Sequence, residues 1–240
     1  MEKFRRLFAG ILCLSMGAFT LVSCENDDPD PLQAAVDVMI QDLKTDAGMR
    51  HGLVIYTTSN YEMKSVKVTG PGTNGEVYDL VAKADKRLFT FEMETGDYTV
   101  ALPKEGDYSF EITSVNDERL TLKDILEDKK LTPIVIKSAT MASQKLKTTW
   151  DLVTGADSYL VKLYSANKAE LLFSSNYLAA DLKEYEFGTS SAGWAYGVSP
   201  MINTNYVVEI LGIKVETGVL TDKANNIQFV TADSITIKWE

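Results

Sequence analysis

Apolar and polar residues alternate along many short stretches of this chain, and turn residues separate these stretches about every ten residues. A period of two turns one face of a strand toward a core and the other toward water. Parallel neighbours would need connecting segments of about a dozen residues, which this spacing does not leave. Residues 33–132 are therefore predicted to form an antiparallel β-sandwich. The apolar members of the runs are Val36, Val38 and Ile40; Val66 and Val68; Phe89, Phe91 and Met93; Tyr98, Val100 and Leu102; and Tyr108, Phe110 and Ile112.

The end of this first half has a different pattern. Leu122, Ile125 and Leu126 follow helical spacing, which predicts one or two turns of helix between residues 120 and 131. Pro133 then indicates a linker, because the residue before a proline avoids the helical conformation. We expect the first domain to end at residue 132.

The second half, residues 133–240, repeats the alternation more clearly. Leu146, Thr148 and Trp150 share one face of a predicted strand. A loop over residues 151–158 leads into the next run, which begins at Tyr159. Later runs contain Tyr206, Val208 and Ile210, and then Ile235, Ile237 and Trp239. We leave the strands between residues 165 and 205 unassigned.

These residues resemble a fibronectin type III domain. That family has a tryptophan on its second strand, a Gly-Ala-x-x-Tyr entry to its third strand, and a tyrosine that opens a later strand after a proline-containing corner. Trp150, Gly155-Ala156-Asp157-Ser158-Tyr159 and the segment from Pro200 to Tyr206 occupy those places. The resemblance implies that the Tyr206 hydroxyl bonds back to the corner. We therefore expect an all-β protein of two tandem antiparallel β-sandwiches, Ig-like over 33–132 and fibronectin type III-like over 133–240.

The N-terminus has the layout of a secretory signal. Three basic residues, Lys3, Arg5 and Arg6, precede an apolar run from Leu7 to Val22. Leu21-Val22-Ser23-Cys24 resembles the lipobox of bacterial lipoproteins, in which cleavage before the cysteine is coupled to acylation of its thiol. We expect residues 1–23 to be removed and Cys24 to carry the lipid. The alternatives are an uncleaved membrane helix, for which this run is short, and an ordinary signal followed by a chance cysteine.

Residues 24–32 are acidic, contain two prolines and show no apolar period, so we expect a flexible tether. An acidic run directly after a lipidated cysteine is similar to the export signal of surface lipoproteins in Bacteroidetes. The resemblance implies an outer-membrane protein that faces the cell exterior, with the periplasmic face as the alternative. A calcium loop is the other interpretation of this stretch, but the glycine and the distal glutamate of such a loop are missing.

The net charge limits the classes of partner that we expect, and the cysteine content limits the disulfides that the chain can form. The net charge is −10, and loss of Lys3, Arg5, Arg6 and Glu2 with the signal makes it −12. Such an acidic chain repels phosphate backbones, so we expect no nucleic acid partner. Of the two cysteines, Cys13 would leave with the signal and Cys24 would be acylated, so no disulfide is expected within the mature chain.

No pattern in the chain predicts catalysis, a metal or a cofactor. His51 is the one histidine, and zinc sites or Ser-His-Asp arrangements need further ligands or a nucleophile motif that the sequence lacks. We interpret His51 as a loop or strand-edge residue. A pair of acidic side chains could still build a glycosidase, but chance alone brings carboxylates together in a chain with 34 acidic residues.

The candidate ligand-binding residues are aromatic. Trp194 and Tyr196 lie between Gly193 and Gly197 and are predicted to point the same way from a loop. Aromatic faces can stack on the C–H faces of sugars. Tyr56 and Tyr61 are a weaker pair of the same kind. The competing interpretation is that Trp194 fills a core.

The sequence therefore predicts a non-catalytic binding protein of the cell surface, with a glycan or a neighbouring surface protein as its partner. The lipid on Cys24 is expected to attach it to the membrane. The similarity to surface lipoproteins implies a place beside glycan uptake. The alternative is a structural or adhesive spacer in a surface complex, joined to its neighbours through sheet edges.

Overall fold

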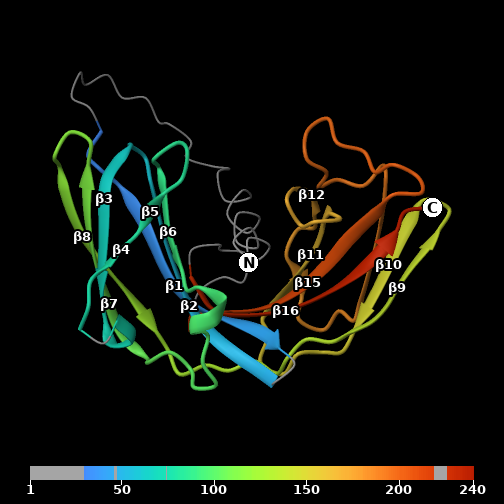
Figure 1. Ribbon diagram of the computed structural model, residues 1–240, viewed down its shortest axis with the longest axis horizontal. Coiled ribbons are helices and arrows are strands. Elements are labelled where there is room, and N and C mark those ends of the chain that lie inside the picture. Colours follow the sequence, from blue (N-terminus) through green and yellow to red (C-terminus); the bar gives the residue numbers. More distant parts are fainter. Residues whose placement is uncertain (1–29, 46–47, 74, 219–225) are drawn as a thin grey trace.

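The computed structural model describes residues 30–45, 48–73, 75–218 and 226–240, and this part of the chain is almost entirely β-strand (Figure 1). The predicted signal peptide, Cys24 and the first residues of the predicted tether lie outside the described residues. Within the described residues, no helix has the length and apolar character needed to span a bilayer. The all-β prediction is confirmed.

The first half contains eight strands and two short 3₁₀ turns. They are β1 (Ala34–Thr45), β2 (Gly48–Ser59), β3 (Met63–Thr69), η1 (Pro71–Thr73), β4 (Tyr78–Asp79), β5 (Val81–Ala82), β6 (Leu88–Glu92), η2 (Thr95–Asp97), β7 (Gly106–Ser114) and β8 (Arg119–Leu126). The second half contains β9 (Ile136–Ala142), β10 (Lys145–Trp150), β11 (Ser158–Ser165), β12 (Leu171–Ser174), β13 (Leu178–Ala179), β14 (Glu184–Gly188), β15 (Asn205–Val215) and β16 (Ile227–Lys238).

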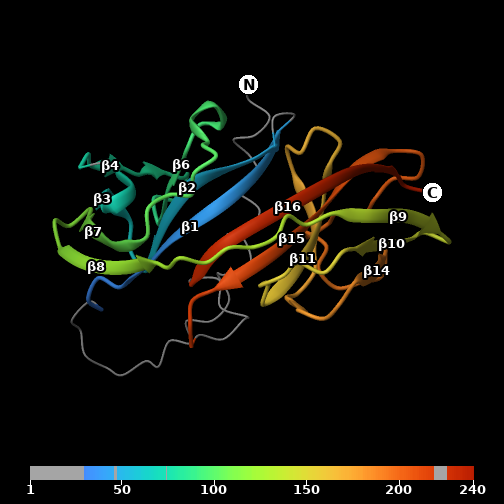
Figure 2. The same ribbon diagram turned by 90° about the horizontal axis from the view of Figure 1, so that it is seen from below.

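Three sheets build two sandwiches. One large sheet has the order β12-β11-β15-β16-β1-β2-β6-β5, with β13 also paired to β11. A sheet of order β4-β3-β7-β8 packs on its first-half part, and a sheet of order β14-β10-β9 packs on its second-half part. Figures 1 and 2 show the large sheet running through both halves.

The two halves meet where β1 and β16 pair in parallel. Ile40 lies opposite Phe229, and Gln41 lies opposite Val230, while all other strand pairs of the described chain are antiparallel. We call this junction the seam. One apolar cluster contains residues of both halves, from Val38 to Trp239. The two sandwiches therefore share one sheet and one apolar core. Residue 132, where we predicted the first domain to end, lies in the segment between β8 and β9.

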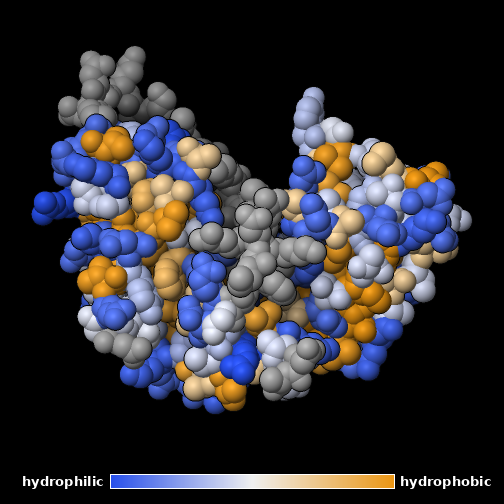
Figure 3. All heavy atoms as spheres, viewed as in Figure 1, coloured by the Kyte–Doolittle hydropathy of each residue, from blue (hydrophilic) through white to orange (hydrophobic). Residues whose placement is uncertain are grey.

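The opposite face of the large sheet is apolar as well. Met39, Val54, Leu211 and Val230 belong to a second buried cluster that crosses the seam. Strand β15 is consequently buried on both faces, unlike the strands of the smaller sheets, in which buried and exposed residues alternate. On the outer surface, hydrophilic and hydrophobic residues are interspersed over both halves (Figure 3).

Most predicted stripes lie on strands, with two corrections. The predicted helical turns at 120–131 are wrong, because Leu120, Leu122 and Leu126 lie on β8 with the period of a strand. The predicted strand through Tyr98, Val100 and Leu102 is also wrong. That segment joins β2 through a single bridge at Thr99, and Val100 is 72% exposed.

The features that the fibronectin type III resemblance implied are present. Trp150 is buried between the sheets and packs against Tyr159, with ring centroids 5.5 Å apart. The Tyr206 hydroxyl accepts a hydrogen bond from the backbone N–H of Met201 at 2.8 Å, which ties the corner to the strand. The unassigned stretch contributes the short strands β12, β13 and β14.

Candidate ligand-binding cavity

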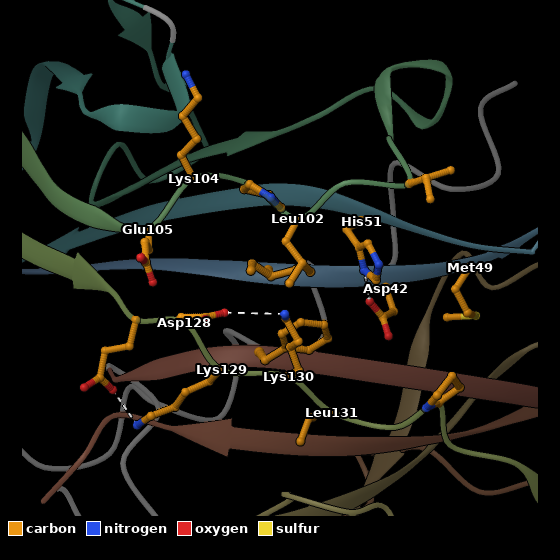
Figure 4. Close-up of a pocket in the computed structure, with 16 residues that line it drawn as sticks. Asp42, Met49, His51, Leu102, Lys104, Glu105, Asp128, Lys129, Lys130 and Leu131 are labelled. Carbon is orange, nitrogen blue, oxygen red and sulfur yellow. Dashed lines mark hydrogen bonds and ion pairs between the residues drawn. The ribbon is translucent and has the colours of Figure 1, made fainter.

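An open cavity of about 690 Å³ lies at the seam (Figure 4). Strands β1, β2 and β16 form its floor, and two irregular segments form its walls: residues 100–105, and the linker 127–133 between β8 and β9. The volume is within the range of small-molecule sites. The residues that line it are Ile40, Asp42, Met49, His51, Val100, Leu102, Pro103, Lys104, Glu105, Glu127, Asp128, Lys129, Lys130, Leu131, Pro133 and Phe229.

His51 and Asp42 form the polar centre of the floor. They lie directly opposite each other on β2 and β1, and the His51 Nδ1 atom is 2.6 Å from the Asp42 Oδ1 atom. The Asp42 side chain is almost completely buried, whereas the His51 side chain is partly exposed to the cavity. A carboxylate on one ring nitrogen fixes the ring's orientation and leaves the other nitrogen for a further partner.

Burial raises the pKa of Asp42 to about 6, and its hydrogen bonds to His51 and Thr231 oppose this rise. Thr231 lies on β16, across the seam, and its hydroxyl also accepts a hydrogen bond from the Ile134 N–H at 3.3 Å. The edge of the Phe229 ring faces the His51 ring, with centroids 6.1 Å apart. Residues of both halves thus hold His51 in place.

Side chains of β16 also hold the linker wall. Gln228 accepts a hydrogen bond from the Glu127 N–H and donates one to the Ile125 carbonyl, both at 2.6 Å. Asp233 accepts one from the Ile136 N–H at 2.9 Å. Figure 2 shows the chain between β8 and β9 passing along the seam, as these bonds require. The linker is therefore a fixed wall of the cavity.

The charged residues of the lining nearly balance, with three lysines against four carboxyl groups. Lys129 forms an ion pair with Glu127 and donates to the Val215 carbonyl at 3.2 Å. Lys130 lies 3.8 Å from Asp128, and both of these side chains are exposed. Because the ammonium groups of Lys129 and Lys130 face carboxylates, the walls present both donors and acceptors without a strong net field.

The polar side chains that line the cavity are carboxylates, lysine ammonium groups and one imidazole. No group of three or more His, Cys, Asp or Glu side chains in the described ranges is arranged to hold a metal ion. Among the described residues that line the cavity, none is a serine, threonine or cysteine. Sequence reasoning placed His51 in a loop or at a strand edge, and it missed Asp42. Asp42 lies three residues before the end of β1 and His51 three residues after the start of β2, and this equal spacing was the signal that could have paired them.

A second group of carboxyls lies on the other face of the sheet, outside this cavity. Asp37 is fully buried, and its Oδ2 atom accepts hydrogen bonds from the Tyr56 hydroxyl at 2.6 Å and the Ile227 N–H at 3.1 Å. Burial raises the pKa of Asp37 well above its usual range. Burial and a hydrogen bond with Glu216 raise the pKa of Asp124 to about 8. These groups connect strands at the seam.

Trp194 packs against other aromatic rings. Its ring centroid lies 5.2 Å from that of Phe173 and 5.8 Å from that of Trp239, and its indole Nε1 donates to the Gly188 carbonyl at 3.0 Å. This is the packing role that the sequence analysis weighed against ligand binding. Tyr196, two residues later, is completely exposed.

The structure does not bring the four predicted aromatic residues together. Tyr56 is buried on β2 with its hydroxyl on Asp37, and Tyr61 is half-buried just beyond the end of that strand. Trp194 and Tyr196 lie in the second half. A ligand-binding role for these residues stays a prediction, for which Tyr196 has the most accessible ring.

Comparison of the sequence with protein-family models and with curated proteins finds no match. Among solved structures, a two-domain fibronectin type III segment of chicken tenascin matches with 10% identity and a TM-score of 0.30, over 86% of this chain and 99% of that one. The FN1–FN3 domains of chicken CNTN1 match with 11% identity and a TM-score of 0.32, over 85% and 66%. A tetra-tandem repeat from the extending region of a large adhesion protein matches with 16% identity and a TM-score of 0.25, over 88% and 50%. Likeness at this level says nothing about function.

Proposed function

We propose that this protein is a lipid-anchored, non-catalytic binding protein of the bacterial cell surface, and that its ligand, a glycan or another surface molecule, occupies the cavity at the seam. The observation that carries this proposal is the construction of the cavity. Both halves contribute to it, the His51–Asp42 pair is fixed at its floor, and β16 side chains hold the linker wall. A rigid, partly apolar concavity with a few convergent polar groups is what binding sites require.

The anchoring part of the proposal rests on the lipobox-like Leu21-Val22-Ser23-Cys24 and the acidic tether. A chain held outside the cytoplasm at its N-terminus can present its two sandwiches to external ligands. Mass spectrometry of the N-terminal peptide from native membranes tests this part. We expect a peptide that begins at acylated Cys24, and a peptide that still contains residues 1–23 would contradict it.

The binding part is tested with the purified protein and a panel of neutral and acidic polysaccharides, by affinity electrophoresis and calorimetry. We expect retardation by at least one polysaccharide, with no release of shorter products. Binding that is unchanged in a variant with the cavity filled, Leu102→Trp, would place the ligand elsewhere. Cleavage of the polysaccharide would contradict the non-catalytic proposal.

The adhesive or spacer alternative predicts a different result. The large sheet ends on the short strands β5 and β12, and short edges resist pairing with another chain. The edge strand β8 carries an exposed apolar side chain, Ile125, which a neighbouring protein could contact. Co-purification of one stoichiometric neighbour from detergent extracts, lost in Ile125→Lys, would favour this alternative.

A further inference from the structure

We propose that the cavity at the seam takes a neutral saccharide, and that the Nε2 atom of His51 accepts a hydrogen bond from one of its hydroxyl groups. This inference rests on the proposed binding function. It adds the chemical class of the ligand and the residue that forms a hydrogen bond with it. Asp42 is a positioning residue, because it acts on the ligand only through His51.

The first step concerns the direction of the His51 hydrogen bonds. A carboxylate can only accept a hydrogen bond, so when the His51 ring is neutral its proton resides on Nδ1, which lies 2.6 Å from the Asp42 Oδ1 atom. The Nε2 atom, on the other side of the ring, is then an acceptor. None of the hydrogen bonds recorded among the described residues uses it. A sugar hydroxyl can donate to such an atom, whereas a carboxylate cannot.

The second step concerns the walls. Leu102 lies close to His51 (Figure 4), and the Phe229 ring lies edge-on to it, so apolar surface that suits the C–H face of a pyranose ring adjoins His51. Lysine ammonium groups and carboxylates also line the cavity, from the segment that contains Lys104 and Glu105 and from the linker residues Asp128, Lys129 and Lys130 (Figure 4). Hydroxyl groups both donate and accept, so a polyol can bond to both kinds of neighbour.

The third step concerns charge. An acidic ligand would need cations to neutralise it, but Lys129 and Lys130 already face Glu127 and Asp128. The mature protein carries a net charge of −12, from −10 less the +2 of residues 1–23, which further repels acidic ligands. A neutral saccharide needs no cation to neutralise it and is not repelled by the net negative charge of the protein.

Because His51 is the single histidine of the chain, its ring can be observed without assignment. The full chain is produced with ¹³C,¹⁵N-labelled histidine and titrated with neutral oligosaccharides (maltohexaose, xylohexaose and mannohexaose) and with oligogalacturonate. We expect the free ring to show the tautomer with the proton on Nδ1. We expect at least one neutral ligand to shift the ring signals in a saturable manner, and oligogalacturonate to leave them unchanged.

Three variants sharpen the test. His51→Gln should weaken binding of that neutral ligand at least tenfold. Asp42→Asn, whose amide donates to Nδ1, should move the proton to Nε2 and weaken binding similarly, and the ¹⁵N shifts report this tautomer change independently of stability. Asp117→Ala, which removes an exposed side chain that does not line the cavity, should leave binding unchanged.

The outcomes separate this inference from the proposed function. If a neutral saccharide binds while the His51 signals stay fixed and Tyr196→Ala abolishes binding, the cavity assignment is overturned and the binding function stands. If only oligogalacturonate shifts the ring, the neutral class is overturned. If no saccharide of either class binds the full chain, the inference fails, and a surface-protein ligand would still satisfy the proposed function.

Discussion

The Asp37 carboxylate accepts a hydrogen bond from the backbone N–H of Ile227 at 3.1 Å, across 190 residues of sequence. The first strand of the protein is thereby tied to the last. Together with the parallel pairing of β1 and β16, this bond joins the two sandwiches through one large sheet that both of them contain.

The first prediction concerns this bond. Asp37→Ala leaves the buried Ile227 N–H without its acceptor, and we expect a loss of about 2–4 kcal/mol in the free energy of unfolding. Asp37→Asn should cost much less, because the amide oxygen can still accept the hydrogen bond from the Ile227 N–H. Urea denaturation checks both. Asp117→Ala, at an exposed ion pair with Lys64, is the control and should change stability little.

The second prediction concerns pH. The pKa of Asp124 is raised to about 8 in the folded protein, above its usual value, so the folded state binds the proton more tightly than the unfolded state. This contribution to stability is fully present at low pH and is lost as the pH rises toward 8. Stability should therefore fall between about pH 5 and pH 8, by up to about 1.4 kcal/mol per pH unit for one such group.

Asp124→Asn should reduce this fall most clearly above about pH 7, where the carboxyl of Asp42, with a pKa of about 6, has largely finished titrating. The Asn oxygen can still accept the hydrogen bond that the Val38 N–H donates to Asp124 at 2.6 Å. Asp107→Asn, at an exposed pair with Lys123, serves as the matched control. The pH dependence of the free energy of unfolding is measured by chemical denaturation. If it were the same for Asp124→Asn and the wild-type protein, the raised pKa of Asp124 would be contradicted.

The third prediction separates Trp194 from Tyr196. Trp194→Ala removes a ring from an aromatic cluster and should cost about 2–4 kcal/mol. Tyr196→Ala should leave stability within about 0.5 kcal/mol, because the side chain is fully exposed. Thermal unfolding of the two variants checks this difference, and a neutral effect of Trp194→Ala would argue against the packing.

The fourth prediction compares two tyrosine hydroxyls. The Tyr159 hydroxyl accepts from the buried Val153 N–H at 2.8 Å, and the Tyr206 hydroxyl accepts from the Met201 N–H at the same distance. Tyr159→Phe leaves its donor buried and unpaired, so we expect a cost of about 1–3 kcal/mol. Tyr206→Phe should cost less, about 0.5–1.5 kcal/mol, because water can reach the exposed Met201 segment. Chemical denaturation that ranked the two variants in the opposite order would refute this account.

Local patterns predicted the strands well. The alternation at Tyr108, Phe110 and Ile112 reflects one buried face, and it gave β7 directly. The expected bond at Tyr206 is also present. The error over residues 120–131 has a physical cause. Leu120, Leu122 and Leu126 share one face of the strand with Asp124 between them, whereas Ile125, which completed the helical spacing, faces solvent.

No local pattern in the sequence predicted the seam or the cavity that lies at it. Parallel pairing of β1 with β16 depends on residues about 190 apart, and no turn or periodicity records it. His51 looked isolated because its partner Asp42 lies across a strand pair and its neighbour Phe229 comes from the other end of the chain. Sites assembled from distant segments require the tertiary structure.

The most direct test of this account asks whether the two sandwiches unfold as one body. All three tryptophans, Trp150, Trp194 and Trp239, lie in the second half, and His51 lies in the first. Urea unfolding followed by tryptophan fluorescence therefore reports the second half, and the His51 NMR signals report the first. We predict a single coincident transition for both probes. Two transitions with separate midpoints would contradict a shared sheet and, with it, a cavity built by both halves.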